Sequence, residues 1–125
     1  RLANVADTYE WWFVPPTGSN WVTVNGGRDS WGGIRKFKTH ARVTGTQSFL
    51  DTLTIKINIS ADDNVKAITI NGTSVDVTEL ATLQYSSWLE FTLPTELFVI
   101  GTNEIVFSIE DGGIVAGLWV QWNVS

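Results

Sequence analysis

Apolar and polar residues alternate along most of the chain after residue 35. Residues 53–59 (LTIKINI) place four apolar side chains on one face and three polar side chains on the other. The same period of two, or a shorter β-rich stretch, occurs at residues 36–43, 105–109, 118–124, 21–24, 66–70, 74–77 and 88–93. A period of two is typical of a strand with one buried and one exposed face. The pattern therefore predicts an all-β antiparallel sandwich of about eight strands.

Turn-forming residues separate these stretches. Asn71 and Gly72 predict a tight hairpin, because both residues tolerate a positive φ. One helical turn is expected at residues 77–83. The first 35 residues have poor periodicity. We expect an N-terminal extension or an added strand over residues 1–20, and the sandwich itself over residues 21–125.

Composition and charge exclude several classes of protein. The 125 residues suit one domain, and 43% hydrophobic with 17% charged residues argue against disorder. The net charge of −5 argues against general binding to nucleic acid or to an anionic membrane. No apolar run approaches the roughly 18 residues of a membrane span, so membrane insertion is not expected. The absence of cysteine removes disulfides and thiolate chemistry.

The run Asp62, Asp63 and Asn64 interrupts two predicted strands and has two interpretations. Adjacent carboxylates can bind a structural calcium ion when a loop bends them toward one point. Asp and Asn side chains also form loop corners, where they accept hydrogen bonds from nearby backbone N–H groups. Both interpretations remain open, and the corner is the one that three side chains alone can satisfy.

Seven tryptophans supply the candidate binding surface. The flat face of an indole suits the C–H face of a sugar ring, and we expect Trp12, Trp31 and Trp119 to be exposed for such stacking. Gln121 and Asn123 share a strand face with Trp119 and would bond sugar hydroxyls. The alternative is that most tryptophans fill the core, or that an exposed patch binds another protein.

Three further tryptophan and charge patterns bear on function. Trp122 shares the apolar face of its strand and is expected in the core, while Trp31 and Trp88 are each either a core anchor or a loop-tip platform. Lys36, Lys38, His40 and Arg42 form a basic stripe on one strand face. Such a stripe is usually a solvated surface, and its functional alternative is a binding site for an acidic sugar or for an acidic neighbouring subunit.

His40 is the only histidine and lacks a local nucleophile, and no catalytic motif is present, so an enzyme is not expected.

The order of these pieces resembles the galactose-binding-domain-like family, the jelly-roll β-sandwich shared by many carbohydrate-binding modules. The matching segments are residues 60–75, 91–111 and 117–122, with SWGG at residues 30–33. Their motifs are Ala61-Asp62-Asp63, Ile70-Asn71-Gly72, Gly101-x-Asn103-x-Ile105-x-Phe107 and Gly117-Leu118. The resemblance implies a jelly-roll fold and permits a structural calcium. Its ligand residues lie on variable loops, so it assigns none of them.

Two functions follow from these observations. The first is a non-catalytic carbohydrate-binding or adhesion module that stacks exposed tryptophans on sugars and needs no cofactor. The second is a structural subunit of an extracellular filament or sheath, or of a phage capsid or tail decoration. There the aromatic and basic faces would be contacts with neighbouring subunits, including a homo-oligomer. Both place the chain outside the cell or on a virion surface.

Overall fold

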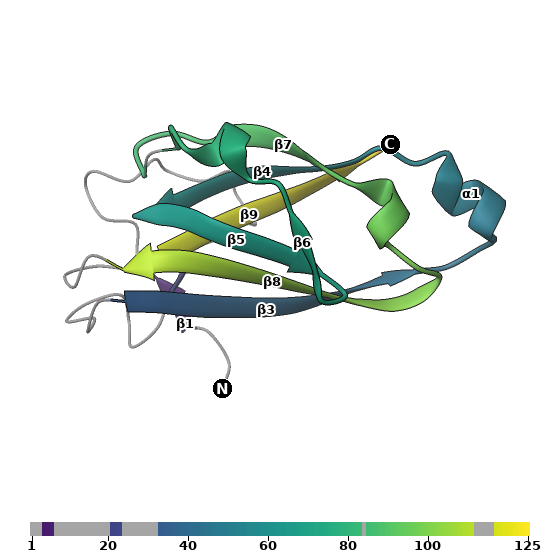
Figure 1. Ribbon diagram of the computed structural model, residues 1–125, viewed down its shortest axis with the longest axis horizontal. Helices are drawn as coiled ribbons and strands as arrows, with labels where there is room; N and C mark the ends of the chain where they lie inside the picture. Colours follow the sequence, from purple (N-terminus) through teal and green to yellow (C-terminus); the bar gives the residue numbers. More distant parts are fainter. Residues whose placement is uncertain (1–3, 7–20, 24–32, 84, 112–116) are drawn as a thin grey trace.

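The computed structural model describes residues 4–6, 21–23, 33–83, 85–111 and 117–125 (Figure 1). Side-chain burial is described from residue 33 onward, with the exceptions of residues 84 and 111–116. The strands are β1 (Asn4–Ala6), β2 (Trp21–Thr23), β3 (Gly33–Val43), β4 (Ile55–Asp62), β5 (Asn64–Ile70), β6 (Thr73–Val75), β7 (Leu89–Leu93), β8 (Gly101–Asp111) and β9 (Gly117–Val124). The helices are α1 (Gln47–Asp51) and the short 3-10 helices η2 (Thr78–Leu80) and η3 (Thr95–Leu97).

The strands form two antiparallel sheets that pack face to face. One sheet has the order β1-β2-β9-β4-β7, and the other has the order β3-β8-β5-β6. In Figure 1, β3 runs along one long side of the molecule and β7 along the opposite side. The predicted all-β antiparallel sandwich is confirmed. The strand β1 pairs with β2 and adds to the eight predicted strands, while the proposed boundary at residue 20 stays a prediction.

The core lies between the facing sides of the two sheets. On β4, Ile55, Ile57 and Ile59 point inward and are buried, as the period of two predicts. Ile105 and Phe107 of β8 do the same from the other sheet. These side chains belong to one continuous apolar cluster, so each sheet buries one face and leaves the other outward.

The hairpin between β5 and β6 forms where Asn71-Gly72 predicted it. Asn71 has a φ of 50° and Gly72 a φ of 83°, the conformations that a tight two-residue turn requires. The Asn71 Nδ2 group donates to the Leu97 carbonyl at 3.1 Å, and its Oδ1 atom accepts from the Glu104 N–H at 2.9 Å. The turn is therefore fastened to η3 and to β8.

Asn103 is a fully buried polar residue at the start of β8. Its Nδ2 group lies within hydrogen-bonding distance of the carbonyl oxygens of Ala41, Val99 and Gly101, at 3.2, 2.9 and 3.2 Å. Its Oδ1 atom accepts from the Val99 N–H and from Asn71 Nδ2, both at 2.8 Å. One side chain thus connects β3, the loop before β8 and the β5–β6 hairpin.

The helical turns differ partly from the prediction. The turn expected at residues 77–83 is present as η2, but the sequence pattern missed α1. That helix begins at the N-cap Thr46, whose Oγ1 atom accepts from the Phe49 N–H at 3.2 Å. Within the described residues, no helix has the length and apolar character needed to cross a membrane.

Candidate functional site

Six polar side chains cover the outer face of β4, β7 and β9. We call this surface the amide face; its members are Thr92, Lys56, Asn123, Glu90, Asn58 and Gln121. The strand register arranges them in two rows across the sheet, because Lys56 lies between Thr92 and Asn123, and Asn58 between Glu90 and Gln121. They face away from the core because they alternate with the buried isoleucines of β4 and their partners.

Contacts within the amide face use only part of its hydrogen-bonding capacity. The Lys56 Nζ atom lies 3.2 Å from Glu90 Oε1, so this pair of opposite charges is balanced. The Asn58 Nδ2 group donates to Gln121 Oε1 at 3.3 Å, and Asn58 Oδ1 is buried, so Asn58 itself offers little to a ligand. The exposed carboxamide of Asn123 makes no side-chain hydrogen bond with the described residues. The surface therefore offers neutral amide groups to a ligand.

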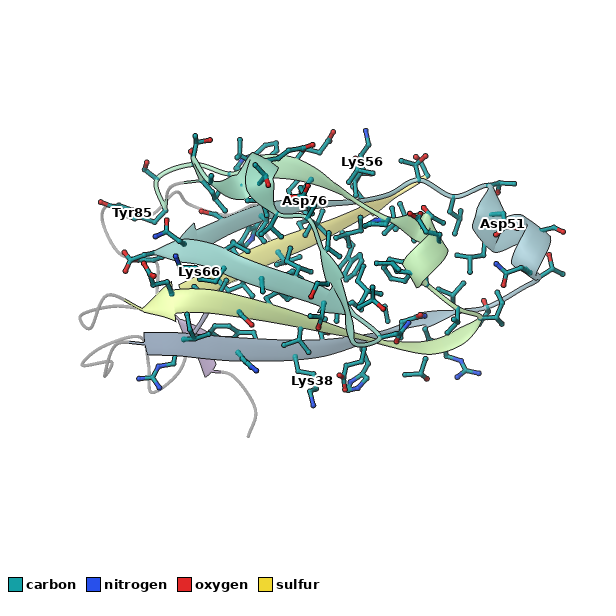
Figure 2. The ribbon with its side chains drawn as sticks, viewed as in Figure 1. Lys38, Asp51, Lys56, Lys66, Asp76 and Tyr85 are labelled. Carbon is teal, nitrogen blue, oxygen red and sulfur yellow. The ribbon has the colours of Figure 1, made fainter. Side chains whose placement is uncertain are left out.

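Exposed aromatic side chains stand beside this face. Trp88 directly precedes β7, is 47% exposed and has the same parity as Glu90 and Thr92. Continuing the pairing of β4 with β7 by one residue places position 88 beside Ser60. Tyr85 is exposed in the same loop, at one end of the molecule in Figure 2. If the register continues in this way, the exposed indole of Trp88 lies at the end of the amide face next to Glu90.

The expectation that Trp119 is exposed for stacking is wrong. Trp119 is 1% exposed, although it lies on the outer side of its sheet and outside the main core cluster. Its neighbour in the register, Ser60, is also fully buried. Strand alternation predicts the face to which a side chain points, but it does not predict whether that face is covered at a given position.

Trp122 shows the converse. It points to the inner side of its sheet, next to Ile57 in the register, yet it is 37% exposed. The described pairing of β9 with β2 is at Leu118 alone, so Trp122 lies beyond that pairing on the strand. The expectation that Trp122 is a core residue is therefore wrong: the side chain points inward but is exposed and is not part of the core cluster.

The other sequence-predicted ligand residues have different outcomes. Gln121 and Asn123 lie on the same outer surface, as the alternation predicted, and Asn58 joins them from β4. Trp12 and Trp31 lie outside the described residues. The predicted carbohydrate contacts of these residues stay predictions. The pattern missed Asn58 as a partner, because only the pairing of β4 with β9 brings it beside Gln121.

The run Asp62, Asp63 and Asn64 forms the corner at which the chain passes from one sheet to the other. Asp62 ends β4 and is buried, and Asn64 begins β5. The Asp63 N–H donates to the Glu110 carbonyl at 2.9 Å, and Asn64 Nδ2 donates to Glu110 Oε1 at 3.1 Å. These bonds join the corner to β8, but they are donated by a backbone N–H and by an amide, so the side-chain acceptors of the loop-corner interpretation stay a prediction. In the described part of the chain, no three His, Cys, Asp or Glu residues form a metal-binding group, and the calcium ion at this corner stays a prediction.

A groove of about 540 Å³ lies beside β5, where β6 has ended and the chain continues into η2. Its polar lining includes Asn64, Lys66, Asp76 and Thr78. The Thr78 hydroxyl and N–H both donate to Asp76 Oδ1, at 2.6 and 3.0 Å, and these bonds lower the pKa of Asp76. Because this carboxylate is already paired within the chain, the groove offers fewer free polar groups than the amide face.

The hydrogen bonds that Glu110 accepts predict that the stability of the fold depends on pH. The hydrogen bond from Lys66, at 3.1 Å, and then that from Asn64 lower the pKa of Glu110 below its ordinary 4.5. A carboxyl group whose pKa is lower in the folded than in the unfolded state stabilises the fold at pH values above the unfolded-state pKa. This contribution to the free energy of unfolding is lost as the pH falls through the folded-state pKa. We expect Glu110→Gln to flatten the decline of unfolding free energy below pH 4.5, as measured by urea denaturation from pH 6 to about pH 3. Lys66→Gln should flatten it in part, and a wild-type slope in both variants would contradict the assignment.

Comparisons with known proteins bear on the fold. No protein-family model and no curated protein sequence match the chain. Among solved structures, the chain is similar to a family 35 carbohydrate binding module from an environmental isolate, with a TM-score of 0.50 and 9% identity. The alignment covers 98% of this chain and 87% of that one. At this identity the likeness concerns the fold, and it confirms the predicted resemblance to the sandwich of carbohydrate-binding modules.

Proposed function

We propose that this chain is a non-catalytic carbohydrate-binding module that binds its ligand on the amide face, next to Trp88. The observation that carries the proposal is the combination of an exposed indole and unused amide groups on one side of β4, β7 and β9. The indole would stack on the C–H face of a sugar ring, and the amides of Gln121 and Asn123 would bond its hydroxyls. Trp12 and Trp31 remain further candidates for stacking.

The charges on this surface favour a neutral ligand. Lys56 and Glu90 compensate each other at 3.2 Å, so the amide face presents no net charge to an approaching sugar. Carboxamides can donate and accept at the same time, which suits hydroxyl groups that do both. A neutral oligosaccharide or polysaccharide is therefore the proposed ligand class.

Two further considerations support the proposal. The solved structure that the chain resembles is that of a carbohydrate binding module, and such a module works without catalysis. The sequence contains no catalytic motif, and His40, its one histidine, has Glu104 as its nearest acidic partner, at 3.9 Å. We propose an extracellular or virion-surface location, where polysaccharides are accessible.

The decisive variant is Trp88→Ala. We expect it to weaken binding to a responsive polysaccharide at least tenfold, because loss of one stacked ring removes about 1.4 kcal/mol or more. The measurement is a screen of neutral polysaccharides by affinity electrophoresis, followed by calorimetry with the best ligand. Gln121→Ala and Asn123→Ala should each weaken binding by a smaller factor.

Phe49→Ala is the matched control. Phe49 is an exposed aromatic on α1, whose helix and the Tyr85 loop lie at opposite ends in Figure 2. Its removal should leave affinity within about twofold of the wild type. Equal affinities of the Trp88→Ala and wild-type proteins for a bound polysaccharide would place the site elsewhere.

A second candidate function is that of an assembly subunit. The observation that favours it is that the exposed Lys36, Lys38, His40 and Arg42 of β3 lie along the long side of the molecule opposite β7, which carries Glu90 (Figure 1). If no glycan binds and the protein associates with itself, this candidate replaces the first.

A further inference from the structure

The outer face of β3 carries most of the positive charge of its sheet. We call Lys36, Lys38, His40 and Arg42 the basic edge; all four are exposed. Glu104 of β8 lies 3.5 Å from Lys38 and 3.9 Å from His40. Lys36 and Arg42 make no ion pair with the described residues. They lie six residues apart, about 20 Å along the strand, so both ends of the basic edge hold an uncompensated cation.

Negative charge gathers around β7. We call the following residues the acidic edge: Asp51 of α1, Asp76 between β6 and η2, Glu79 of η2, Glu90 of β7 and Glu96 of η3. The helix η2 packs with β7, η3 follows β7 in the chain, and α1 packs with η3 at one end of the molecule, so the acidic edge extends from β7 to that end (Figure 2). Lys56, through Glu90, is the one described cation that an ion pair joins to this edge. The hydrogen bonds from Thr78 hold the pKa of Asp76 low and keep it charged.

The two edges cannot neutralise each other within one molecule. Among the described strands, β3 ends the four-stranded sheet and β7 ends the five-stranded sheet. Figure 1 places these strands along opposite long sides, and Figure 2 shows Lys38 pointing away from the side on which Lys56 projects. With histidine neutral, the basic edge and Glu104 have a net charge of +2, and the acidic edge and Lys56 have a net charge of −4.

We propose that the basic edge docks against the acidic edge of a second copy of this chain. The charge complementarity lies between two different surfaces, so the contact is heterologous and the copies associate head to tail. Repetition of such a contact closes a ring or extends into a filament. This proposal goes beyond carbohydrate binding. Glu90 belongs to both the amide face and the acidic edge, so the residues chosen for the test, Glu79 and Glu96, lie outside the amide face.

Salt weakens the long-range repulsion between two chains, each with a net charge of −5, more than it weakens direct contacts between the two edges. The screening length is about 30 Å at 10 mM salt, about 8 Å at 150 mM and about 3 Å at 1 M. At 10 mM the whole-chain repulsion opposes docking, while at 150 mM it is screened and the edge contacts persist. We therefore expect association to be strongest near 150 mM salt and to be lost near 1 M.

The test uses reciprocal charge reversal. One variant combines Lys36→Glu with Arg42→Glu, and the other combines Glu79→Lys with Glu96→Lys. Sedimentation velocity over a concentration series at 150 mM salt should show concentration-dependent oligomers for the wild type and at least tenfold weaker self-association for each variant. An equimolar mixture of the two variants should associate again, because each supplies an edge that complements the other.

Controls keep the outcomes distinct. The combination of Lys36→Arg with Arg42→Lys preserves charge and should preserve association. Circular dichroism melts verify folding, and all variants should keep the polysaccharide affinity of the wild type if the amide face binds sugar. A wild type that stays monomeric at every concentration and salt, or oligomers that resist both reversals, would overturn the proposal. Association that requires an added anionic polymer would also overturn it.

Discussion

Asn103→Asp is expected to lower the free energy of unfolding by about 3–5 kcal/mol, because it places an unpaired charge in the interior. Asn103 is 0% exposed, and its Nδ2 group faces the carbonyl oxygens of Ala41, Val99 and Gly101. A carboxylate has no proton to donate there and meets three acceptors. Guanidinium denaturation at pH 7 measures the loss.

Asn123→Asp is the matched control for this substitution. It makes the same chemical change on a strand, but Asn123 is exposed on the amide face. Its cost should stay within about 0.5 kcal/mol. If the two variants had equal stability, the buried network around Asn103 would not contribute as its five hydrogen bonds indicate.

The same residue shows how far a sequence pattern predicts this fold. The alternation through Asn103, Ile105 and Phe107 places all three side chains inward, and two of them are apolar core residues. A polar residue at an inward position signals a buried hydrogen-bonding role. Its partners cannot be predicted from the pattern, because Ala41 lies on another strand and Val99 in a loop.

The candidate site could also be predicted only in part. The pattern predicts the side of the sheet to which a side chain points, but not what packs over it. Alternation correctly placed Gln121 and Asn123 on an outward face, and the structure adds Asn58 through the pairing of β4 with β9. It could not separate Trp119 from Trp122, because burial on a strand depends on what packs over it from distant parts of the chain. The helix α1 was missed because its start depends on the N-cap Thr46, a local signal that a periodic pattern of apolar residues does not contain.

Trp119→Ala is expected to lower the free energy of unfolding by about 3–5 kcal/mol, the usual cost of deleting a large buried aromatic side chain. Trp119 is almost completely shielded from solvent and lies beside the buried Ser60 in the register. Removal of the indole leaves a cavity at a position that solvent barely reaches. Urea denaturation followed by far-ultraviolet circular dichroism measures this loss without relying on tryptophan emission.

Trp122→Ala supplies the comparison on the same strand. Trp122 is partly exposed, so solvent can enter the space that its side chain leaves, and the loss should be smaller, about 1–2 kcal/mol. Were Trp119 instead an exposed stacking residue, the order of the two losses would be reversed, and Trp119→Ala would weaken polysaccharide binding while leaving stability nearly unchanged. Stability and affinity measured on the same two variants therefore separate a buried structural tryptophan from a ligand-binding one.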